Sequence, residues 1–207
     1  MYQRYGKRCL DVILSLIALI VLSPLFLLIA LAIRLDSPGG VIFSQKRVGM
    51  HKKLFSIYKF RTMSPRTPAD VATHQLVGAE NYISRTGRVL RKLSLDELPQ
   101  LWNILKGDMS FVGPRPVVLT ETDLLRLRSR NGASSVRPGL TGLAQVSGRD
   151  CVTVPEKARL DGQYARCQSA ALDCRILLKT VGYVLHSSGV VEGANPAITH
   201  CKKERSA

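Results

Sequence analysis

The most prominent pattern in the chain is an uninterrupted apolar run near its start. No charged residue occurs from Val12 to Ile33, and sixteen of these positions are Leu, Ile, Val or Phe. On insertion scales each such residue contributes about 0.3 to 0.6 kcal/mol, so the run favours lipid by roughly 5 to 10 kcal/mol and outweighs one mid-helix proline at ~3 kcal/mol. The pattern predicts a segment that enters a membrane.

Ser23 and Pro24 interrupt this run at its midpoint. Pro24 cannot donate to the carbonyl of Ile20 and its ring crowds that carbonyl, while the Ser23 hydroxyl can bond to an upstream carbonyl. A bend here would leave two arms that each cross only about half of a bilayer. We therefore expect a re-entrant helical hairpin with Ser23 and Pro24 at its bend.

Basic residues on both sides of the run favour the same topology, because positively charged loops stay in the cytoplasm. They are Arg4, Lys7 and Arg8 before the run and Arg34, Lys46, Arg47, Lys52 and Lys53 after it. A single-pass anchor remains an equal alternative on physical grounds. A cleaved signal peptide fits less well, since its apolar core should be shorter and free of proline.

The rest of the chain predicts an α+β fold: a mostly helical cytosolic domain with a short β-hairpin. The hairpin is expected from two β-rich runs, Val41–Ser44 and Leu54–Arg61. A surface loop should follow over Pro65–Glu80. Apolar residues at helical spacing over Leu172–Leu185 predict a basic amphipathic helix that packs on the core or lies at the lipid surface. These elements divide the chain into a membrane part at 1–35, a main domain at 36–190 and a tail at 191–207.

The charge of the chain indicates an anionic partner. There are 30 Lys and Arg against 15 Asp and Glu, a formal net charge of +15. Nucleic acid, anionic lipid and phosphorylated small molecules all satisfy this requirement. The four histidines are scattered and the five cysteines contain no Cys-x-x-Cys pair, so the sequence does not indicate a zinc site. It also contains no Walker loop and no dinucleotide-binding loop.

Two adjacent acids, Asp96 and Glu97, are the strongest candidates for chemistry. Pro99 is tolerated only near a helix start, so the pair should lie in or just before a first helical turn. There the helix dipole would favour the ionised carboxylate that a nucleophile requires. The alternative is structural, because Ser94-x-x-Glu97 matches a helix capping box.

Basic residues in rigid loops form a second group of candidates. Arg115 and Arg137 are held by neighbouring proline and glycine residues, and Arg149 follows closely. Such loops suit bidentate contacts to phosphate oxygens, because little conformational freedom is lost on binding. Lys59 and Arg61 add a further basic position. A solvated surface role is the alternative for any one of these side chains.

Together these residues resemble the monotopic phosphoglycosyl transferases, also called bacterial sugar transferases or polyprenyl-phosphate hexose-1-phosphate transferases. The likeness runs from about Tyr5 to Gly189. It rests on Lys7-Arg8 with Asp11, Ser23-Pro24, Asp36-Ser37-Pro38-Gly39, Tyr58-Lys59-Phe60-Arg61-Thr62-Met63, Ser94-Leu95-Asp96-Glu97-Leu98-Pro99-Gln100-Leu101, Gly107 to Pro116 and Arg137-Pro138-Gly139-Leu140-Thr141-Gly142. The chain departs from many members at Gly162-Gln163-Tyr164, where an aromatic pair is usual.

The resemblance implies a two-step reaction. Asp96 would attack the β-phosphate of a UDP-sugar and release UMP, and a polyprenyl phosphate, such as undecaprenyl phosphate, would then take the phospho-sugar from the enzyme. Glu97 would help to hold Mg²⁺. The phosphates and nucleotide would be bound by the basic residues Lys59, Arg61, Arg91, Arg115, Arg137 and Arg149.

The implied setting is the inner membrane of a bacterium, with the catalytic domain on the cytoplasmic face and the lipid bilayer as a partner. The reaction would be the first membrane step in the assembly of a glycan such as an exopolysaccharide, an O-antigen or a glycoprotein glycan. The sequence does not decide the oligomeric state, and a homodimer is one of the partners to be considered. A nucleic-acid-binding protein is disfavoured, because few aromatic residues are present for base stacking. A scaffold held at anionic lipid by its basic flanks is a third reading.

Overall fold

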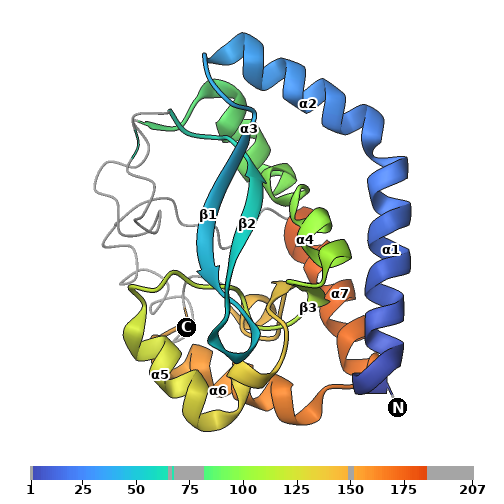
Figure 1. The fold of residues 1–207 in the computed structure, drawn as a ribbon, viewed down its shortest axis with the longest axis vertical. Coiled ribbons are helices and arrows are strands. Elements are labelled where there is room, and N and C mark those ends of the chain that lie inside the picture. Colours follow the sequence, from blue (N-terminus) through green and yellow to red (C-terminus); the bar gives the residue numbers. More distant parts are fainter. Residues whose placement is uncertain (1, 65–66, 68–81, 149–151, 186–207) are drawn as a thin grey trace, which may run out of the picture.

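The computed structural model describes residues 2–64, 67, 82–148 and 152–185. Helices α1 (Lys7–Val21) and α2 (Ser23–Asp36) run along one edge of the molecule as a bent pair (Figure 1). Among the described residues no helix taken singly has the length and apolar character to cross a bilayer, but α1 and α2 together do, and they bend by 60° at their junction. The Ser23 hydroxyl donates to the Ile20 carbonyl at 2.8 Å, as the sequence predicted.

The bent pair has two different faces. On the inner face Phe26, Ile29 and Ile33 pack with Phe60 and Leu90 of the domain. The outer face carries eleven large exposed apolar side chains: Leu10, Ile13, Leu14, Leu16, Ile17, Ile20, Val21, Leu27, Leu28, Leu31 and Leu35. An exposed set of apolar side chains of this size is typical of a site that contacts another protein or a membrane.

The predicted hairpin is confirmed and is longer than expected. Strands β1 (Ile42–Val48) and β2 (Leu54–Phe60) pair antiparallel, from Ile42 opposite Phe60 to Val48 opposite Leu54. The sequence pattern ended the first strand at Ser44 because polar residues follow. Those residues continue the ladder, since Gln45 and Arg47 pair with Ile57 and Phe55. The turn contains the 3₁₀ segment Met50–Lys52, in which His51 and Lys52 have positive φ.

A second, two-stranded sheet joins segments that are distant in sequence. Strands β3 (Ser110–Val112) and β4 (Gly139–Thr141) pair in parallel, with Ser110 opposite Gly139. The backbones approach so closely that a Cβ at Gly139 would lie 2.1 Å from the Gly113 nitrogen. This contact places the two proline-held arginine segments, which looked alike in sequence, side by side.

Five more helices complete the described part of the chain, and the fold is mixed and mostly helical, as predicted. They are α3 (Arg85–Lys92), α4 (Gln100–Lys106), α5 (Thr122–Asn131), α6 (Val154–Cys167) and α7 (Ala170–Leu185). Short turns of π or 3₁₀ type occur at Tyr2–Gly6, Leu95–Glu97, Ala133–Ser135 and Gln145–Ser147. The predicted loop at Pro65–Glu80, apart from Thr67, and the tail at 191–207 lie outside the described residues.

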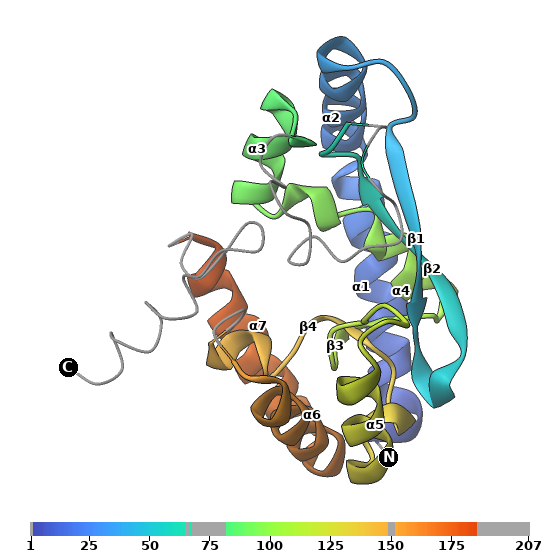
Figure 2. The same ribbon diagram turned by 90° about the vertical axis from the view of Figure 1, so that its left-hand side faces the viewer.

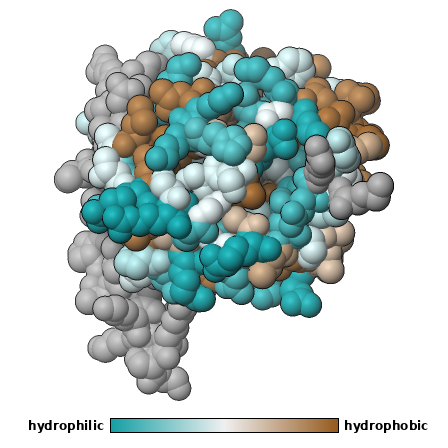
Figure 3. Space-filling view, turned by 60° about the horizontal axis from the view of Figure 1, so that its bottom comes forward, coloured by the Kyte–Doolittle hydropathy of each residue, from teal (hydrophilic) through white to brown (hydrophobic). Residues whose placement is uncertain are grey.

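Helix α7 packs on the core, which decides between the two positions expected for it. Ile176 is buried with Val112, Val146 and Tyr164, whereas Leu178 is exposed. Seen from the side, α6 and α7 lie across the molecule from the β1–β2 hairpin (Figure 2). The face at the bottom of Figure 1, near α5 and α6, is largely hydrophilic, with apolar side chains gathered toward its edges (Figure 3).

A buried polar network attaches the start of the chain to α7. Asp173 accepts hydrogen bonds from Lys7 at 2.5 Å, from the Tyr2 hydroxyl at 2.6 Å and from the Tyr164 hydroxyl at 2.7 Å. The Val112 carbonyl lies 3.0 Å from the same Tyr164 hydroxyl. We refer to Tyr2, Lys7, Tyr164 and Asp173 as the anchor network.

Two further side chains of α1 hold it against the domain. Asp11 accepts from the Ser110 hydroxyl and the Phe111 amide, both at 3.1 Å. Arg8 donates to the carbonyls of Ile104 and Leu105 at the end of α4, at 2.6 and 2.8 Å. Because a cation at a helix C-terminus satisfies free carbonyls and complements the helix dipole, Arg8 stabilises this junction.

Candidate active site

Asp96 and Glu97 lie in the 3₁₀ turn Leu95–Glu97, just before α4, which confirms their predicted position. The capping-box alternative is wrong. Ser94 has left-handed backbone geometry, with φ of 56°, and its hydroxyl makes no capping bond. Glu97 is therefore available for contacts with other side chains.

Glu97 is held between two cations from different parts of the fold. Its Oε1 accepts from Lys59 Nζ at 2.6 Å and from Arg115 Nη2 at 2.9 Å. Lys59 belongs to β2, and Arg115 belongs to the segment after β3. Burial acts to raise the pKa of Glu97, but Arg115 and Lys59 outweigh it and hold that pKa well below its usual range. The two cations thus favour the ionised form of Glu97 in this site.

Asp96 has the opposite electrostatic character. Its side chain is 12% exposed, and Lys59 Nζ lies 4.0 Å from its Oδ2. Burial raises the pKa of Asp96 and the neighbouring Glu97 adds to this rise, while Lys59, Arg91 and Arg115 oppose it. Burial therefore opposes the ionised form that the helix start was expected to favour.

Lys59, Arg91, Asp96, Glu97 and Arg115 form what we call the carboxylate cluster. Three cations surround two carboxylates, so the cluster has a net positive charge that an anionic ligand would balance. Arg91 comes from α3, where its Nη2 lies 3.8 Å from the sulfur of Met63. Four separate segments therefore converge on one small site.

The sequence interpretation missed Arg47 as a member of this region. Its pKa is lowered to about 10, first by burial and then by the nearby positive charge of Arg115, while Glu121 and Glu97 oppose the change. Arg47 Nη2 donates to Gln45 Oε1 at 2.6 Å. The alternation of β1, which places Gln45 and Arg47 on one face of the hairpin, was the signal that could have identified it.

Two other predicted basic residues, Arg61 and Arg137, are placed differently. Arg61 donates to the carbonyls of Pro38 and Ser37 at 2.6 and 2.8 Å, and so holds the turn after α2. Arg137 Nε donates to the Gly107 carbonyl at 3.0 Å. Arg149 lies outside the described residues. Of the six predicted basic residues, the structure brings Lys59, Arg91 and Arg115 to the acidic pair.

The acidic pair fits a Mg²⁺ ion that shares its ligands with a substrate. Within the described residues there is no group of three or more His, Cys, Asp or Glu side chains that could hold a metal. Mg²⁺ commonly uses one or two protein carboxylates and takes its other ligands from water and substrate phosphates. Asp96 and Glu97 provide carboxylates in that number.

Comparison with known proteins places this fold and site in a family. The family model for bacterial sugar transferases matches residues 2–187. The chain belongs to the bacterial sugar transferase family. The uncharacterized sugar transferase EpsL of Bacillus subtilis is 41% identical over 186 residues, which cover 89% of each chain. The motif resemblance is thereby confirmed, and the chain is an enzyme.

Two further relatives of this sugar transferase carry descriptions of an activity. The UDP-glucose:undecaprenyl-phosphate glucose-1-phosphate transferase of Caulobacter vibrioides is 42% identical over 187 residues, 86% of this chain and 69% of its own. The undecaprenyl-phosphate galactose phosphotransferase of Salmonella typhimurium is 38% identical over 201 residues, 90% of this chain and 42% of its own. The region shared with the family contains both the bent helix pair and the carboxylate cluster.

Proposed function

We propose that this sugar transferase moves a sugar 1-phosphate from a UDP-sugar to polyprenyl phosphate, such as undecaprenyl phosphate, and releases UMP. The observation that carries the proposal is the carboxylate cluster. In it a buried aspartate lies beside a glutamate whose pKa is held low, and three cations around the two acids give a net positive charge that suits a diphosphate. The names of the Caulobacter and Salmonella relatives support the same acceptor.

In the first step an Asp96 carboxylate oxygen attacks the β-phosphorus of the donor, which carries the sugar. The bond between that phosphorus and the bridging oxygen breaks, and UMP leaves with the oxygen. Lys59, Arg91 and Arg115 act electrostatically on Asp96 and would neutralise the negative charge that grows on the leaving group, because fixed cations in a water-poor site stabilise such charge strongly. Asp96 then carries the sugar phosphate as an acyl phosphate.

In the second step a phosphate oxygen of the polyprenyl phosphate attacks the same phosphorus. The acyl phosphate bond breaks, Asp96 is regenerated as a carboxylate, and the product is a polyprenyl diphosphate sugar. The cations of the carboxylate cluster now orient the acceptor phosphate. Mg²⁺, held with Glu97 among its ligands, would supply further neutralisation of the phosphate charge.

The bent helix pair suits this reaction as a re-entrant membrane element. Helix α1 has 15 residues and α2 has 14, so each is about 22 Å long or less, shorter than a ~30 Å hydrocarbon core. The exposed apolar face of the pair would lie in the cytoplasmic leaflet of the inner membrane. A site beside that leaflet meets the acceptor phosphate at headgroup level without extracting its lipid tail.

The primary test of the proposed reaction is Asp96→Asn in membranes supplied with a panel of UDP-sugars and polyprenyl phosphate. UMP release should fall to background, whereas Glu97→Gln should reduce it. Asp123→Asn is the matched control, because Asp123 is an exposed acid on α5 that pairs with the exposed Arg126. Full UMP release by the Asp96 variant would rule out the assigned nucleophile.

The covalent intermediate can be trapped by omitting the acceptor. Trypsin should release Leu93–Lys106 as one peptide containing both acids of the pair. Fragmentation of this peptide should place the added sugar phosphate on position 96 and not on position 97. An enzyme that turns over steadily without any such adduct contradicts the two-step reaction.

The topology is tested separately by cysteine labelling in sealed vesicles. Tyr5→Cys and Lys46→Cys, each in a background without the five native cysteines, place a thiol before α1 and after α2. A re-entrant pair makes both positions react from the cytoplasmic side. Labelling from opposite sides would show a spanning anchor.

A further inference from the structure

A buried ion pair joins α5 to α6 at a point that sequence reasoning did not single out. Arg128 is 5% exposed and Asp161 is 1% exposed. Arg128 Nε donates to Asp161 Oδ2 at 2.8 Å, and Nη2 lies 2.6 Å from the same oxygen. By contrast, the pair between Arg126 and Asp123 on the same helix is solvent-exposed, with a separation of 3.8 Å.

The third nitrogen of Arg128 connects this pair to the carboxylate cluster. Arg128 Nη1 donates to the backbone carbonyl of Arg115 at 2.9 Å. Arg115 Nη2 in turn contacts Glu97 Oε1 at 2.9 Å. A continuous chain of contacts therefore runs from Asp161 through Arg128 and Arg115 to Glu97.

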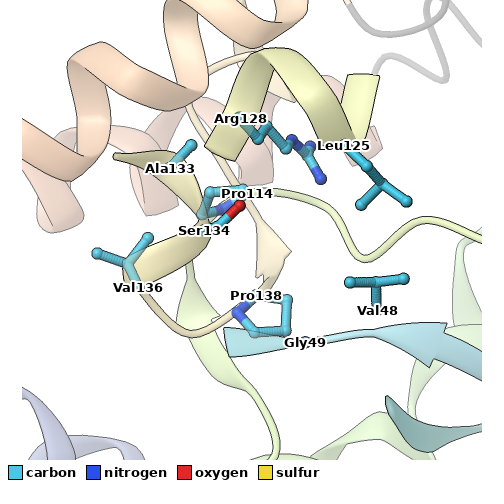
Figure 4. Close-up of a pocket in the computed structure, with 9 residues that line it drawn as sticks. All are labelled: Val48, Gly49, Pro114, Leu125, Arg128, Ala133, Ser134, Val136 and Pro138. Carbon is cyan, nitrogen blue, oxygen red and sulfur yellow. The ribbon is translucent and has the colours of Figure 1, made fainter. Parts of the chain in front are cut away.

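The surroundings explain why Arg115 needs an external support. Pro114 and Pro116 flank it and have no N–H group, so the segment is held through its carbonyls: the Pro114 carbonyl accepts from the Gly139 amide and the Arg115 carbonyl accepts from Arg128, both at 2.9 Å. Arg128 of α5 and Pro114 line a small cavity of about 20 Å³, together with Val48 and Pro138 (Figure 4). The backbone of this segment is therefore fixed through acceptors, and Arg128 supplies the donor for the Arg115 carbonyl.

The chemistry of the guanidinium suits such a support. Its nitrogens form a rigid planar fork, so one face can hold a carboxylate while another nitrogen holds a carbonyl. Stability alone is a weak reason for the pair, since replacing a buried ion pair by apolar residues of similar volume is often neutral or stabilising. An orienting role accounts for both the ion pair and the extra bond to Arg115.

We propose that Arg128, oriented by Asp161, is a positioning residue of the transferase reaction. It fixes the Arg115 backbone so that the Arg115 guanidinium meets Glu97 and the diphosphate of the donor. The proposal rests on the phosphate-binding role assigned to Arg115 under the proposed function. Arg128 itself touches neither the reacting atoms nor the acidic pair in the contacts described above.

The first test removes both buried charges together, in Arg128→Met with Asp161→Leu. We expect a folded protein with a thermal midpoint near that of the native enzyme, and UMP release lowered about 10- to 100-fold, the loss typical of a misplaced catalytic group. The matched control is Arg126→Gln with Asp123→Asn, which removes the exposed pair on the same helix. Native UMP release in the buried double variant would overturn the proposal.

The second test asks whether the effect passes through Arg115. In an Arg115→Ala background, the buried double substitution should cause no further loss of kcat/KM, and both changes should shift the acid limb of the pH profile in the same direction. A general loosening of the fold would instead multiply the two losses, which would contradict a positioning role. If the double variant does not fold, Arg128→Lys replaces it in this test. Lysine keeps a positive charge facing Asp161 but cannot also hold the Arg115 carbonyl, so this variant too should lose UMP release.

Failure of the proposed function gives a different result. If Arg115→Ala releases UMP at the native rate, the role of Arg115 is wrong and Arg128 has nothing to position. If no UDP-sugar yields UMP, a crystal structure of the double variant decides the structural claim. Retention of the 2.9 Å contact between Arg115 and Glu97 would overturn it, and loss of that contact would support it.

Discussion

The anchor network and the carboxylate cluster both hold carboxylates against basic side chains, yet they differ in charge balance. In the anchor network one carboxylate, Asp173, meets one cation, Lys7, and two neutral hydroxyls. Burial, together with Asp173, raises the pKa of Tyr2 and of Tyr164, so both remain neutral donors. The single negative charge of Asp173 is therefore balanced by the single positive charge of Lys7 within the network.

The carboxylate cluster is not balanced in this way. Three cations surround Asp96 and Glu97, and the two acids have pKa values displaced in opposite directions. Paired groups with divergent pKa values are typical of functional sites. The difference between the regions shows that charge excess, more than burial or residue type, separates a binding site from a structural joint.

The largest effect should be a loss of stability when the carboxylate of the anchor network is removed. Asp173→Asn leaves Lys7 buried without a charged partner, which should cost about 3–5 kcal/mol in the free energy of unfolding. Chemical unfolding in detergent measures this loss. The exposed-pair control Asp123→Asn should cost less than about 1 kcal/mol. Equal losses of stability in the two variants would contradict a special structural role for the anchor network.

Removing a cation from the carboxylate cluster should lower activity more than stability. Lys59→Met removes a cation that contacts both acids, so UMP release should fall about 10²- to 10³-fold, as when one preorganised donor is lost. Thermal unfolding should change less than in Asp173→Asn, because Glu97 keeps Arg115 as a charged partner. Lys106→Met is the control, because Lys106 is exposed and paired with Asp108. A large drop in stability with unchanged turnover would reverse the assignment.

A smaller effect is expected on stability at the nucleophile itself. Because burial raises the folded-state pKa of Asp96 above its unfolded value, ionised Asp96 destabilises the fold at neutral pH. Asp96→Asn should therefore be more stable than the native enzyme at pH 7, and this gain should vanish as pH falls below the ordinary aspartate pKa of about 3.9. Unfolding curves at several pH values check the sign, which a destabilised variant would contradict.

The smallest effect concerns the acid limb of the activity profile. Glu97 is one of the charges that raise the pKa of Asp96, so Glu97→Gln should lower that pKa. The residual UMP release of the variant should then persist to lower pH than that of the native enzyme. An acid limb that moves to higher pH would show that Asp96 is not the titrating group.

Much of the local architecture could be predicted from residue order. The bend at Ser23, the hairpin and the place of Asp96 before a helix follow from local rules on proline, strand pattern and helix starts. The full length of β1 was missed, because a strand pattern that becomes polar resembles a loop unless its partner is known. Gly162 illustrates the same limit, since its missing Cβ matters only because the Asn131 side chain packs against it.

What the sequence by itself determined is the set of chemical groups and the short-range geometry that carries them: a bent apolar segment, an acidic pair at a helix start and arginines held by proline. Only the tertiary structure decided which charges meet. Arg115 and Arg137 have similar local sequences and neighbouring strands, yet one side chain binds Glu97 and the other a backbone carbonyl. The physical reason is that electrostatic contacts act through space, and the parallel pairing of β3 with β4 and the buried Arg128–Asp161 pair set those distances between residues far apart in the chain.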